Sequence, residues 1–209
     1  IKASVWGARR IDMRTEKQKI LILGANGQVG KELSRRAGNF EVNATAFTRK
    51  ELDITDSQAV ARILENLRPN TVINSAAYTA VDDAENYPEV AYKVNRDAPE
   101  NLAKICEKLS IPIIHISTDY VFDGKKSAAY REDDPVRPLG IYGRSKEAGE
   151  AVIRDNTEKY IILRTSWVYA AHGNNFLRTM MRLANERSEL DIVEDQFGVP
   201  TCAVDIADA

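Results

Sequence analysis

The stretch KILILGANGQVG, residues 19–30, decides the fold class of this chain. A short apolar run, KILIL, is followed at once by glycines in the spacing G-x-x-G-x-x-G, at Gly24, Gly27 and Gly30. Between a strand and a helix, the first glycine permits a tight turn, the second lets backbone N–H groups approach a pyrophosphate, and the third lets helix and strand pack closely. The pattern therefore predicts a dinucleotide-binding loop, with a glycine turn that binds no ligand as the alternative.

Strand and helix patterns alternate along the rest of the chain. Strand-length apolar runs, typical of buried parallel strands, occupy residues 19–23, 41–47, 71–74, 111–117, 160–164 and 190–193. Amphipathic helical patterns occupy residues 28–36, 56–67, 88–109, 142–155 and 176–186. Because this alternation requires parallel strands joined by crossovers, we expect an α/β fold with a doubly wound, Rossmann-type parallel sheet.

The segments between these elements allow three further predictions. Thr55 is the expected N-cap of the second helix, and a last helix is expected to begin after Thr201. The polar stretch 123–137 directly follows a strand. We therefore expect it to form a long loop at the carboxyl edge of the sheet, where folds of this class bind ligands.

Composition and charge exclude some classes of protein. The 209 residues contain 29 Lys and Arg against 31 Asp and Glu, a formal net charge of −2, so the basic excess of a nucleic-acid-binding protein is missing. No apolar run approaches the roughly 20 residues that cross a bilayer, and residues 1–19 hold no signal-peptide core. We expect a cytoplasmic protein with a small-molecule ligand and no membrane partner. Cys106 and Cys202 lack metal-ligand spacing and predict no disulfide.

The beginning of the chain is interpreted separately. We read residues 1–18 as an N-terminal extension and residues 19–209 as the dinucleotide-binding domain with the start of a substrate-binding part. The first twelve residues have no clean periodicity and precede Met13. The alternative is an N-terminal strand or arm that uses Val5 and Trp6.

The end of the second strand predicts the choice of cofactor. An NAD-binding site commonly has a carboxylate here that bonds the adenosine 2′-hydroxyl. This chain instead has Thr48, Arg49 and Lys50, a hydroxyl and two cations that suit a 2′-phosphate, so NADPH is favoured over NADH. A solvated turn is the alternative. Asp53 and Ile54 are expected close to the adenine ring.

A second motif predicts proton-transfer chemistry. Tyr142 and Lys146 form Y-x-x-x-K on a predicted helix, and this spacing puts both side chains on one face. We expect the ammonium to lower the pKa of the phenol toward neutrality, so that it exchanges a proton with a carbonyl or alcohol oxygen. Thr118 or Ser117, at the end of the fourth strand, can donate to the same oxygen. The motif alone also fits an exposed helix pair.

Two other groups of side chains are interpreted as structural. Asp82, Asp83 and Glu85 form an acidic cluster that is more typical of a solvated helix face than of a metal site. His115, within the fourth strand, is more typical of a core histidine than of a catalyst.

Seven segments together give the chain a family resemblance. They are GANGQVGKEL (24–33), ELDITD (51–56), NSAAYTAVDDAE (74–85), STDYVFDG (117–124), YGRSKEAGE (142–150), LRTSWVYAAHGNNFLRTM (163–180) and VEDQFGVPT (193–201). The sequence resembles the extended short-chain dehydrogenase/reductases and, within them, the dTDP-4-dehydrorhamnose reductase family, over residues 19–209. The segments with STDYVF, RTSWVY and GNNF are the most specific.

The resemblance implies roles for residues at matching positions. Thr118, Tyr142 and Lys146 would be the catalytic residues. Asp119, Trp167 and Thr118 would lie near the sugar nucleotide, although Trp167 also suits a core aromatic. The implied cofactor site comprises Gly24, Asn26, Gly27, Gln28, Val29, Gly30, Thr48, Arg49, Asp53, Ile54, Ala76, Ala77, Tyr78, Tyr142 and Lys146.

The resemblance also implies an activity and a domain organisation. The expected activity is NADPH-dependent reduction, with NADH as the second cofactor, of the 4-keto group of dTDP-4-dehydro-β-L-rhamnose. Family members continue beyond the position of Ala209 to complete a small substrate-binding domain, so we expect this chain to contain only its start. The family allows a homodimer and, in some members, Mg²⁺; no metal ligand is assigned in this sequence.

Two other functions fit the same motifs. The regulatory β subunit of methionine adenosyltransferase resembles this group closely and binds NADP without an established reductase activity, so the intact Thr118, Tyr142 and Lys146 do not separate the two. A sugar-nucleotide epimerase or dehydratase of the same fold would need further acid or base groups at the strand end, where Asp119 and Tyr120 are the candidates.

Overall fold

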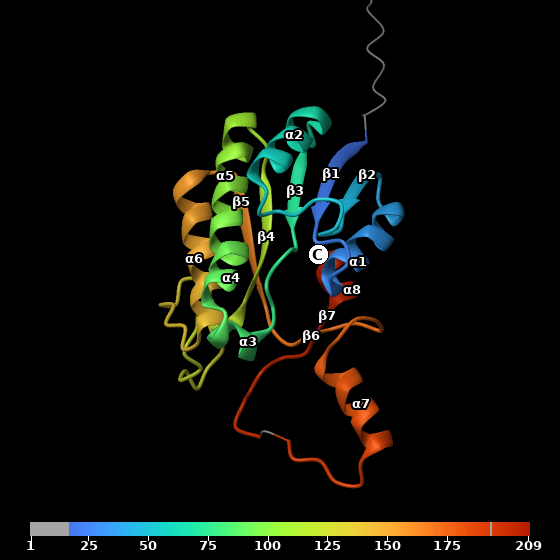
Figure 1. Ribbon diagram of the computed structural model, residues 1–209, viewed down its shortest axis with the longest axis vertical. Helices are drawn as coiled ribbons and strands as arrows, with labels where there is room; N and C mark the ends of the chain where they lie inside the picture. Colours follow the sequence, from blue (N-terminus) through green and yellow to red (C-terminus); the bar gives the residue numbers. More distant parts are fainter. Residues whose placement is uncertain (1–16, 193) are drawn as a thin grey trace, which may run out of the picture.

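A five-stranded parallel sheet forms the centre of the computed structural model, which describes residues 17–192 and 194–209 (Figure 1). Its strands lie in the order β2-β1-β3-β4-β5, and every neighbouring pair is parallel. They are β1 (Gln18–Leu23), β2 (Val42–Phe47), β3 (Thr71–Asn74), β4 (Ile113–Thr118) and β5 (Tyr160–Thr165). The predicted doubly wound sheet is confirmed. Most of the predicted extension, residues 1–16, lies outside the described residues.

Helices cover both faces of the sheet and build two separate cores. On one face pack α2 (Ser57–Leu67), α5 (Ala98–Leu109) and α6 (Ile141–Asn156), which contribute Leu64, Leu102 and Ile153. On the other face pack α1 (Gln28–Arg36) and α8 (Ala203–Asp208), with Val29 and Ile206. The large core buries the side chains that stabilise the sheet, at roughly 1.5–3 kcal/mol for each fully buried large aliphatic residue.

The predicted helix 88–109 is interrupted in the structure. After α3 (Val81–Asn86), the segment divides into α4 (Pro88–Tyr92), one wide turn at residues 93–97 and then α5. Within the wide turn, the buried Asn95 side chain bonds both backbone groups of Tyr78 and the hydroxyl of Ser145. Helical periodicity does not encode this insertion because the partners are far away in the sequence.

The strand predicted at 190–193 is wrong. Residues 190–192 have no regular structure and Ile192 is 55% exposed, while residue 193 lies outside the described part. A strand requires a neighbour, and this segment runs away from the sheet after α7 (Phe176–Glu186) (Figure 1). Instead, two very short strands pair in parallel, β6 (Val168–Tyr169) with β7 (Thr201–Cys202). The helix expected after Thr201 is confirmed as α8.

The expected N-cap of α2 and the expected exposure of two strands also require correction. Asp56, rather than Thr55, caps α2, because its carboxylate accepts a hydrogen bond from the N–H of Ala59 at 3.0 Å. The outer strands β2 and β5 are only partly covered, since each has a neighbour on one side only, whereas the prediction treated all strands as buried.

The loop 123–137 folds upon itself beside α6 and contributes nothing to the cavity described below. Phe122 stacks on Tyr130 with ring centroids 4.2 Å apart, and the Tyr130 hydroxyl donates to Asp123 at 2.8 Å. Lys126 pairs with Asp134 across the same loop. The loop was expected to bind a ligand. Its side chains instead bond one another, and none of its residues lines the cavity.

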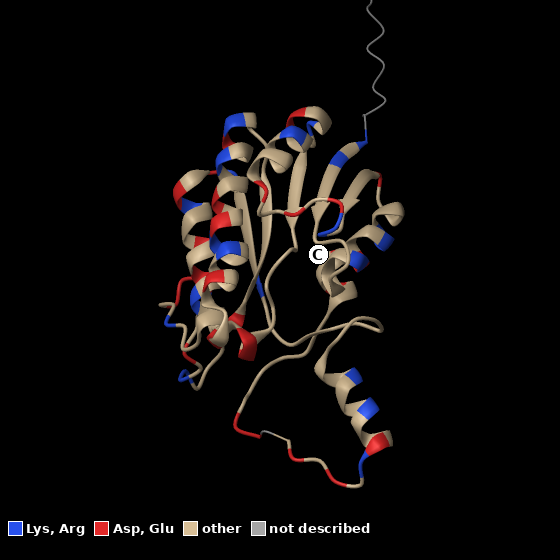
Figure 2. Ribbon diagram, viewed as in Figure 1, with Lys and Arg blue, Asp and Glu red and all other residues tan. Residues whose placement is uncertain are grey.

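The two longest described helices carry charges of both signs. Figure 2 shows acidic and basic residues interspersed along α5 and α6, in agreement with the small net charge. Among the described helices, none combines the length and apolar character that spanning a membrane requires. Cys106 and Cys202 are both free, as predicted.

Candidate active site

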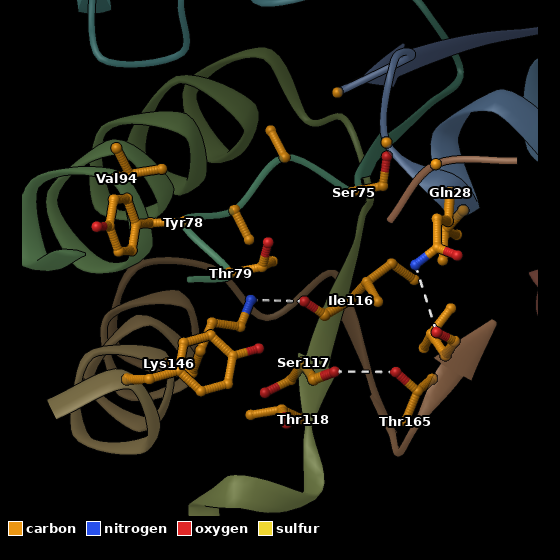
Figure 3. A pocket seen from close by; sticks show the side chains of 18 of the residues that line it. Gln28, Ser75, Tyr78, Thr79, Val94, Ile116, Ser117, Thr118, Lys146 and Thr165 are labelled. Atoms are coloured by element: carbon orange, nitrogen blue, oxygen red, sulfur yellow. Dashed lines mark hydrogen bonds between the residues drawn. The ribbon is translucent and has the colours of Figure 1, made fainter. Parts of the chain in front are cut away.

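A cavity of about 610 Å³ lies at the carboxyl ends of the strands. Its volume is typical of a small-molecule site. Figure 3 shows that it is surrounded by side chains from α1, β4 and α6 and from the segment that follows β3. The predicted residues that line it are Gly24, Asn26, Gly27, Gln28, Val29, Arg49, Asp53, Ile54, Ala76, Ala77, Tyr78, Thr118, Asp119, Tyr142, Lys146 and Trp167. Gly30 and Thr48 do not line it.

The glycine loop is held by backbone contacts that exclude side chains. Gly24 has a φ of +82°, and a Cβ placed there would lie 2.6 Å from the backbone nitrogen of Ala76. A Cβ at Gly30 would lie 2.2 Å from the carbonyl oxygen of Gly24. Gly30 therefore lets α1 pack against the loop from behind, which is why it does not reach the cavity.

The first turn of α1 faces the cavity without a side-chain cap. Gly27 is the N-cap and supplies no side-chain acceptor for the first N–H groups of the helix. These groups and the helix dipole favour an anion. Gln28 is oriented away from this position: its amide donates to the carbonyl of Val168 at 3.3 Å (Figure 3) and, by its oxygen, accepts from Asn175 at 2.8 Å.

At the end of β2, one predicted cation reaches the cavity. Arg49 lines it with a side chain that is 78% exposed, and its Nε lies 3.4 Å from Asp53 Oδ2. The hydroxyl and backbone N–H of Thr48 instead both donate to Glu51, at 2.8 and 2.9 Å. Sequence reasoning missed the Glu51 carboxylate, which accepts the hydrogen bond that the Thr48 hydroxyl donates.

Thr118 and Tyr142 meet at the end of β4. Both side chains line the cavity, and Tyr142 also packs edge-on against Tyr120 with ring centroids 5.5 Å apart. Burial raises the pKa of Tyr142 to about 12, although a hydrogen bond with Thr118 opposes the shift. Asp119 lies next to them, and burial raises the pKa of its carboxyl as well.

The expected effect of Lys146 on Tyr142 is wrong in this structure. The Nζ atom of Lys146 donates to the carbonyl of Ile116 at 2.7 Å (Figure 3) and lies 3.2 Å from Nε2 of His115. Burial lowers the pKa of Lys146 to about 8, against the opposing charge of Glu150. For both Tyr142 and Lys146, removal from water outweighs any attraction between them, so the phenol becomes a weaker acid rather than a stronger one.

Two carboxylates hold α6 in place, and the sequence analysis assigned this role to neither of them. Glu150, on α6, is buried and accepts from Ser117 at 2.6 Å and from Arg164 at 2.7 and 2.9 Å. Glu85, read as part of a solvated cluster, accepts from the N–H of Ile141 at 2.7 Å. Tyr142 directly follows this capped residue. The available signal for Glu150 was its position four residues after Lys146, on the same face of the helix.

Trp167, which follows β5, also lines the cavity. Trp167 has a φ of +45° and is 40% exposed, so it is not a core aromatic. Its indole packs so closely against Gly198 that a Cβ there would lie 2.4 Å from Nε1. No group of three or more His, Cys, Asp or Glu residues that could hold a metal occurs in the described chain.

Comparisons with known proteins agree with this geometry. A family profile described as "RmlD substrate binding domain" matches residues 18–209. The chain is 48% identical over 190 residues to a dTDP-4-dehydrorhamnose reductase of Burkholderia thailandensis, which covers 91% of this chain and 63% of that protein. It is 46% identical over 192 residues to the enzyme of the same name from Aggregatibacter actinomycetemcomitans, with 90% and 65% covered. The chain thus spans slightly less than two thirds of these relatives.

Solved structures give the same result. A dTDP-4-dehydrorhamnose reductase from Bacillus anthracis in complex with NADP has a TM-score of 0.89 and 41% identity, covering 92% of this chain and 68% of that one. A UDP-glucose 4-epimerase from Brucella ovis has a TM-score of 0.81 at 18% identity, which shows a shared fold alone. With a family match across nearly every described residue, the chain belongs to the RmlD substrate-binding domain family.

Proposed function

We propose that this protein, at the full length of its relatives, reduces the 4-keto group of dTDP-4-dehydro-β-L-rhamnose to give dTDP-β-L-rhamnose, with NADPH as the reductant. The observation that carries the proposal is that Thr118 and Tyr142 line the same cavity as the glycine loop. A ketone held there would lie beside both a proton donor and a dinucleotide site. The sugar and its nucleotide follow from the names of the relatives.

The residues of the cavity fit a nicotinamide dinucleotide. The uncapped first turn of α1 offers N–H groups to a pyrophosphate, and the small side chains of Ala76 and Ala77 leave room after the end of β3. Asp53 lines the part of the cavity next to Arg49, and its carboxylate accepts from the N–H of Thr55 at 2.9 Å. We assign this part to the adenosine.

Arg49 supports NADPH as the preferred reductant. Its guanidinium makes one contact of 3.4 Å with Asp53 and is otherwise mostly exposed at the cavity, so it can turn toward a 2′-phosphate. Lys50 and Thr48 do not line the cavity, so this role falls to Arg49. The relative from Bacillus anthracis is in complex with NADP, which agrees with this preference.

Tyr142 is the proton donor in the proposed reaction. Its raised pKa keeps the phenol protonated at neutral pH, so that the O–H bond breaks as the proton passes to the ketone oxygen. A bound reduced nicotinamide would supply the hydride that the carbonyl carbon accepts. The Thr118 hydroxyl, which donates to Asp119 at 3.2 Å, would orient the same oxygen.

Three other residues bind and orient in this proposal. Lys146 is expected to bond the nicotinamide ribose. Asp119 and the partly exposed Trp167 also line the cavity, and we assign them to the sugar nucleotide.

The substitution Tyr142→Phe tests the reductase proposal. It removes the proton donor and keeps the ring, so kcat should fall by roughly 10²–10⁴-fold while the affinity for NADPH changes by a few fold at most. The measurement is the loss of nicotinamide absorbance in the presence of the keto sugar, in a protein that carries this chain at the length of its relatives. Tyr130→Phe is the matched control, because Tyr130 lies outside the cavity and should keep normal turnover.

A Tyr142→Phe variant that reduced the sugar at nearly the normal rate would contradict the catalytic assignment. Absence of turnover in the unsubstituted protein, with NADPH binding retained, would favour the non-catalytic NADP-binding subunit instead.

A further inference from the structure

Residues 170–175 form a strap that connects β6 to α7 and lies against α1. At one end of the strap, Ala170 is 5% exposed and packs with Val29 of α1 in the smaller core. At the other end, the Asn175 side chain caps α7 by accepting from the N–H of Arg178 at 3.0 Å, and Arg178 donates to the carbonyl of Ala171. The fold therefore fixes both ends of the strap, and the position of residues 172–174 depends on further contacts.

Two polar side chains of α1 supply these contacts. Gln28 donates to the carbonyl of Val168 at 3.3 Å and accepts from Nδ2 of Asn175 at 2.8 Å, so it bonds the chain on both sides of the strap. Four residues later, Oε1 of Glu32 lies 2.9 Å from Nε2 of His172, in the middle of the strap. Because residues four apart lie on the same face of a helix, α1 presents both contacts to the strap.

Charge strengthens the contact between Glu32 and His172. Glu32 is 5% exposed, and Nε of Arg35 donates to its other carboxylate oxygen at 2.8 Å. This bond, together with the one from His172, holds the pKa of Glu32 below its ordinary value, although burial opposes the shift. An ionised carboxylate can only accept, so Nε2 of His172 is the donor. Because hydrogen bonds to charged groups are stronger than those between neutral groups, this bond firmly attaches the middle of the strap to α1.

The tip of the strap forms part of the cavity wall. Gly173 and Asn174 line the cavity beside the first turn of α1. Gly173 has a φ of +73°, and a Cβ there would lie 3.0 Å from Cγ of Gln28, so the tip packs closely on that turn. The N–H groups of the same turn are the ones that we assign to the pyrophosphate. Glu32 and His172 do not line the cavity, so they reach a ligand there only through the strap.

We propose that the strap retains the pyrophosphate of a bound dinucleotide, and that Glu32 and His172 are positioning residues that hold the strap in place. This role rests on the proposed function, because it requires a nicotinamide dinucleotide in the cavity. A strap fixed on α1 keeps its tip beside the pyrophosphate, whereas a loosened strap opens a way out. The pair therefore controls how fast the dinucleotide dissociates, without touching the dinucleotide itself.

Three substitutions of His172 test the pair. The amide nitrogen of glutamine lies at about the same distance from the backbone as Nε2 of histidine, so His172→Gln keeps the donor to Glu32. In His172→Asn the amide is one methylene shorter, and in His172→Ala the donor is missing. We expect the dissociation rate of NADPH to rise about tenfold in His172→Asn and His172→Ala, a change of about 1.4 kcal/mol, and to stay nearly normal in His172→Gln.

Stopped-flow fluorescence of the reduced nicotinamide measures this rate when the complex of protein and NADPH is mixed with excess NADP⁺. The association rate of NADPH should not fall in the same variants, because the glycine loop is unchanged, whereas a substitution that only damaged the fold would lower it. Arg35→Gln is the matched control. The Arg35 side chain is 61% exposed and bonds Glu32 from outside the strap, so its removal should leave the dissociation rate nearly normal.

The mobility of the strap gives a second test, by NMR relaxation in the protein without cofactor. We expect the backbone order parameters of Gly173 and Asn174 to be near about 0.85 in the unsubstituted protein and in His172→Gln. In His172→Asn and His172→Ala they should fall below about 0.6, because the tip has lost its attachment to α1. The residues of β1, at the centre of the sheet, should keep their order parameters in every variant.

Equal NADPH dissociation rates in His172→Ala and in the unsubstituted protein would overturn the proposal. Unchanged order parameters at the tip in His172→Ala, or a His172→Gln rate equal to that of His172→Ala, would also overturn it. If the rates follow the expected pattern but the protein at the length of its relatives shows no turnover, the reductase proposal alone fails. If the unsubstituted protein binds no NADPH, both proposals fail, so the failures are distinguishable.

Discussion

Replacing Glu150 by glutamine should destabilise the protein by about 3 kcal/mol. The Glu150 carboxylate is fully buried and accepts two hydrogen bonds from Arg164, at 2.7 and 2.9 Å. Breaking one side of a buried ion pair costs roughly 3–5 kcal/mol, because the remaining charge is left without its partner. The Arg164 side chain retains 20% exposure, so water compensates in part and the expected loss lies at the lower end.

Urea unfolding of the chain measures this loss, with a lower midpoint and an unchanged dependence on denaturant. Arg154→Gln is the matched control. Arg154 also bonds Glu150, at 3.1 Å, but its side chain is 37% exposed, so we expect a loss below about 1 kcal/mol. Against a typical total of roughly 5–15 kcal/mol, the two substitutions should be clearly separated.

The effect of Glu150 should also depend on pH. Burial alone would raise the pKa of Glu150, but the hydrogen bonds from Arg164, Ser117 and Arg154 outweigh it and hold the pKa below its ordinary value. A lowered pKa in the folded state stabilises the protein above the unfolded value, and this contribution is lost as the pH falls through the folded value. The difference between the wild type and Glu150→Gln should therefore shrink in acid. A loss under about 1 kcal/mol at neutral pH, or one equal to that of Arg154→Gln, would refute the reasoning.

Three further predictions concern the cofactor, the reaction and the packing of α6. Arg49→Ala should weaken NADPH binding about tenfold or more and leave NADH binding nearly unchanged, since one charge-assisted bond contributes roughly 1.5–3 kcal/mol; equal losses in titrations with both cofactors would contradict the assignment. With the pKa of Tyr142 raised to about 12, the phenol remains protonated below that value, so no fall in reduction rate should arise from Tyr142 until strongly alkaline pH; a rate that halves near neutrality through this residue would show a lowered pKa instead. Gly149→Ala would place a Cβ 2.0 Å from the carbonyl oxygen of Asn95 and should cost at least about 1–3 kcal/mol in thermal or urea unfolding. Gly38→Ala, with open space around it, should stay within about 0.5 kcal/mol, and similar losses for both would show that the α6 contact is not tight.

Local patterns were sufficient for most of the sheet and for the cofactor loop. The run of apolar residues at 19–23 and the glycines after it determine a strand, a turn and a helix through short-range sterics, so the sequence alone indicated β1, α1 and the loop between them. Y-x-x-x-K likewise placed Tyr142 and Lys146 on one helix face, because that relation follows from helical geometry. The apolar run at 190–193 predicted a strand that does not form, because a strand exists only where a neighbouring strand pairs with it.

The protonation of the site was decided by tertiary structure alone. Nothing near Tyr142 in the sequence predicts that burial would raise its pKa, and the lysine four residues later predicted the reverse. Burial and hydrogen-bond direction depend on segments far apart in the chain: Ile116 and His115 on β4 face Lys146, and Asn74 on β3 faces His115. The sequence by itself determined the glycine loop and the helical spacing of Tyr142 and Lys146. Only the fold decided which side chains reach the cavity and which of them carry a proton, because the cost of a charge depends on what surrounds it.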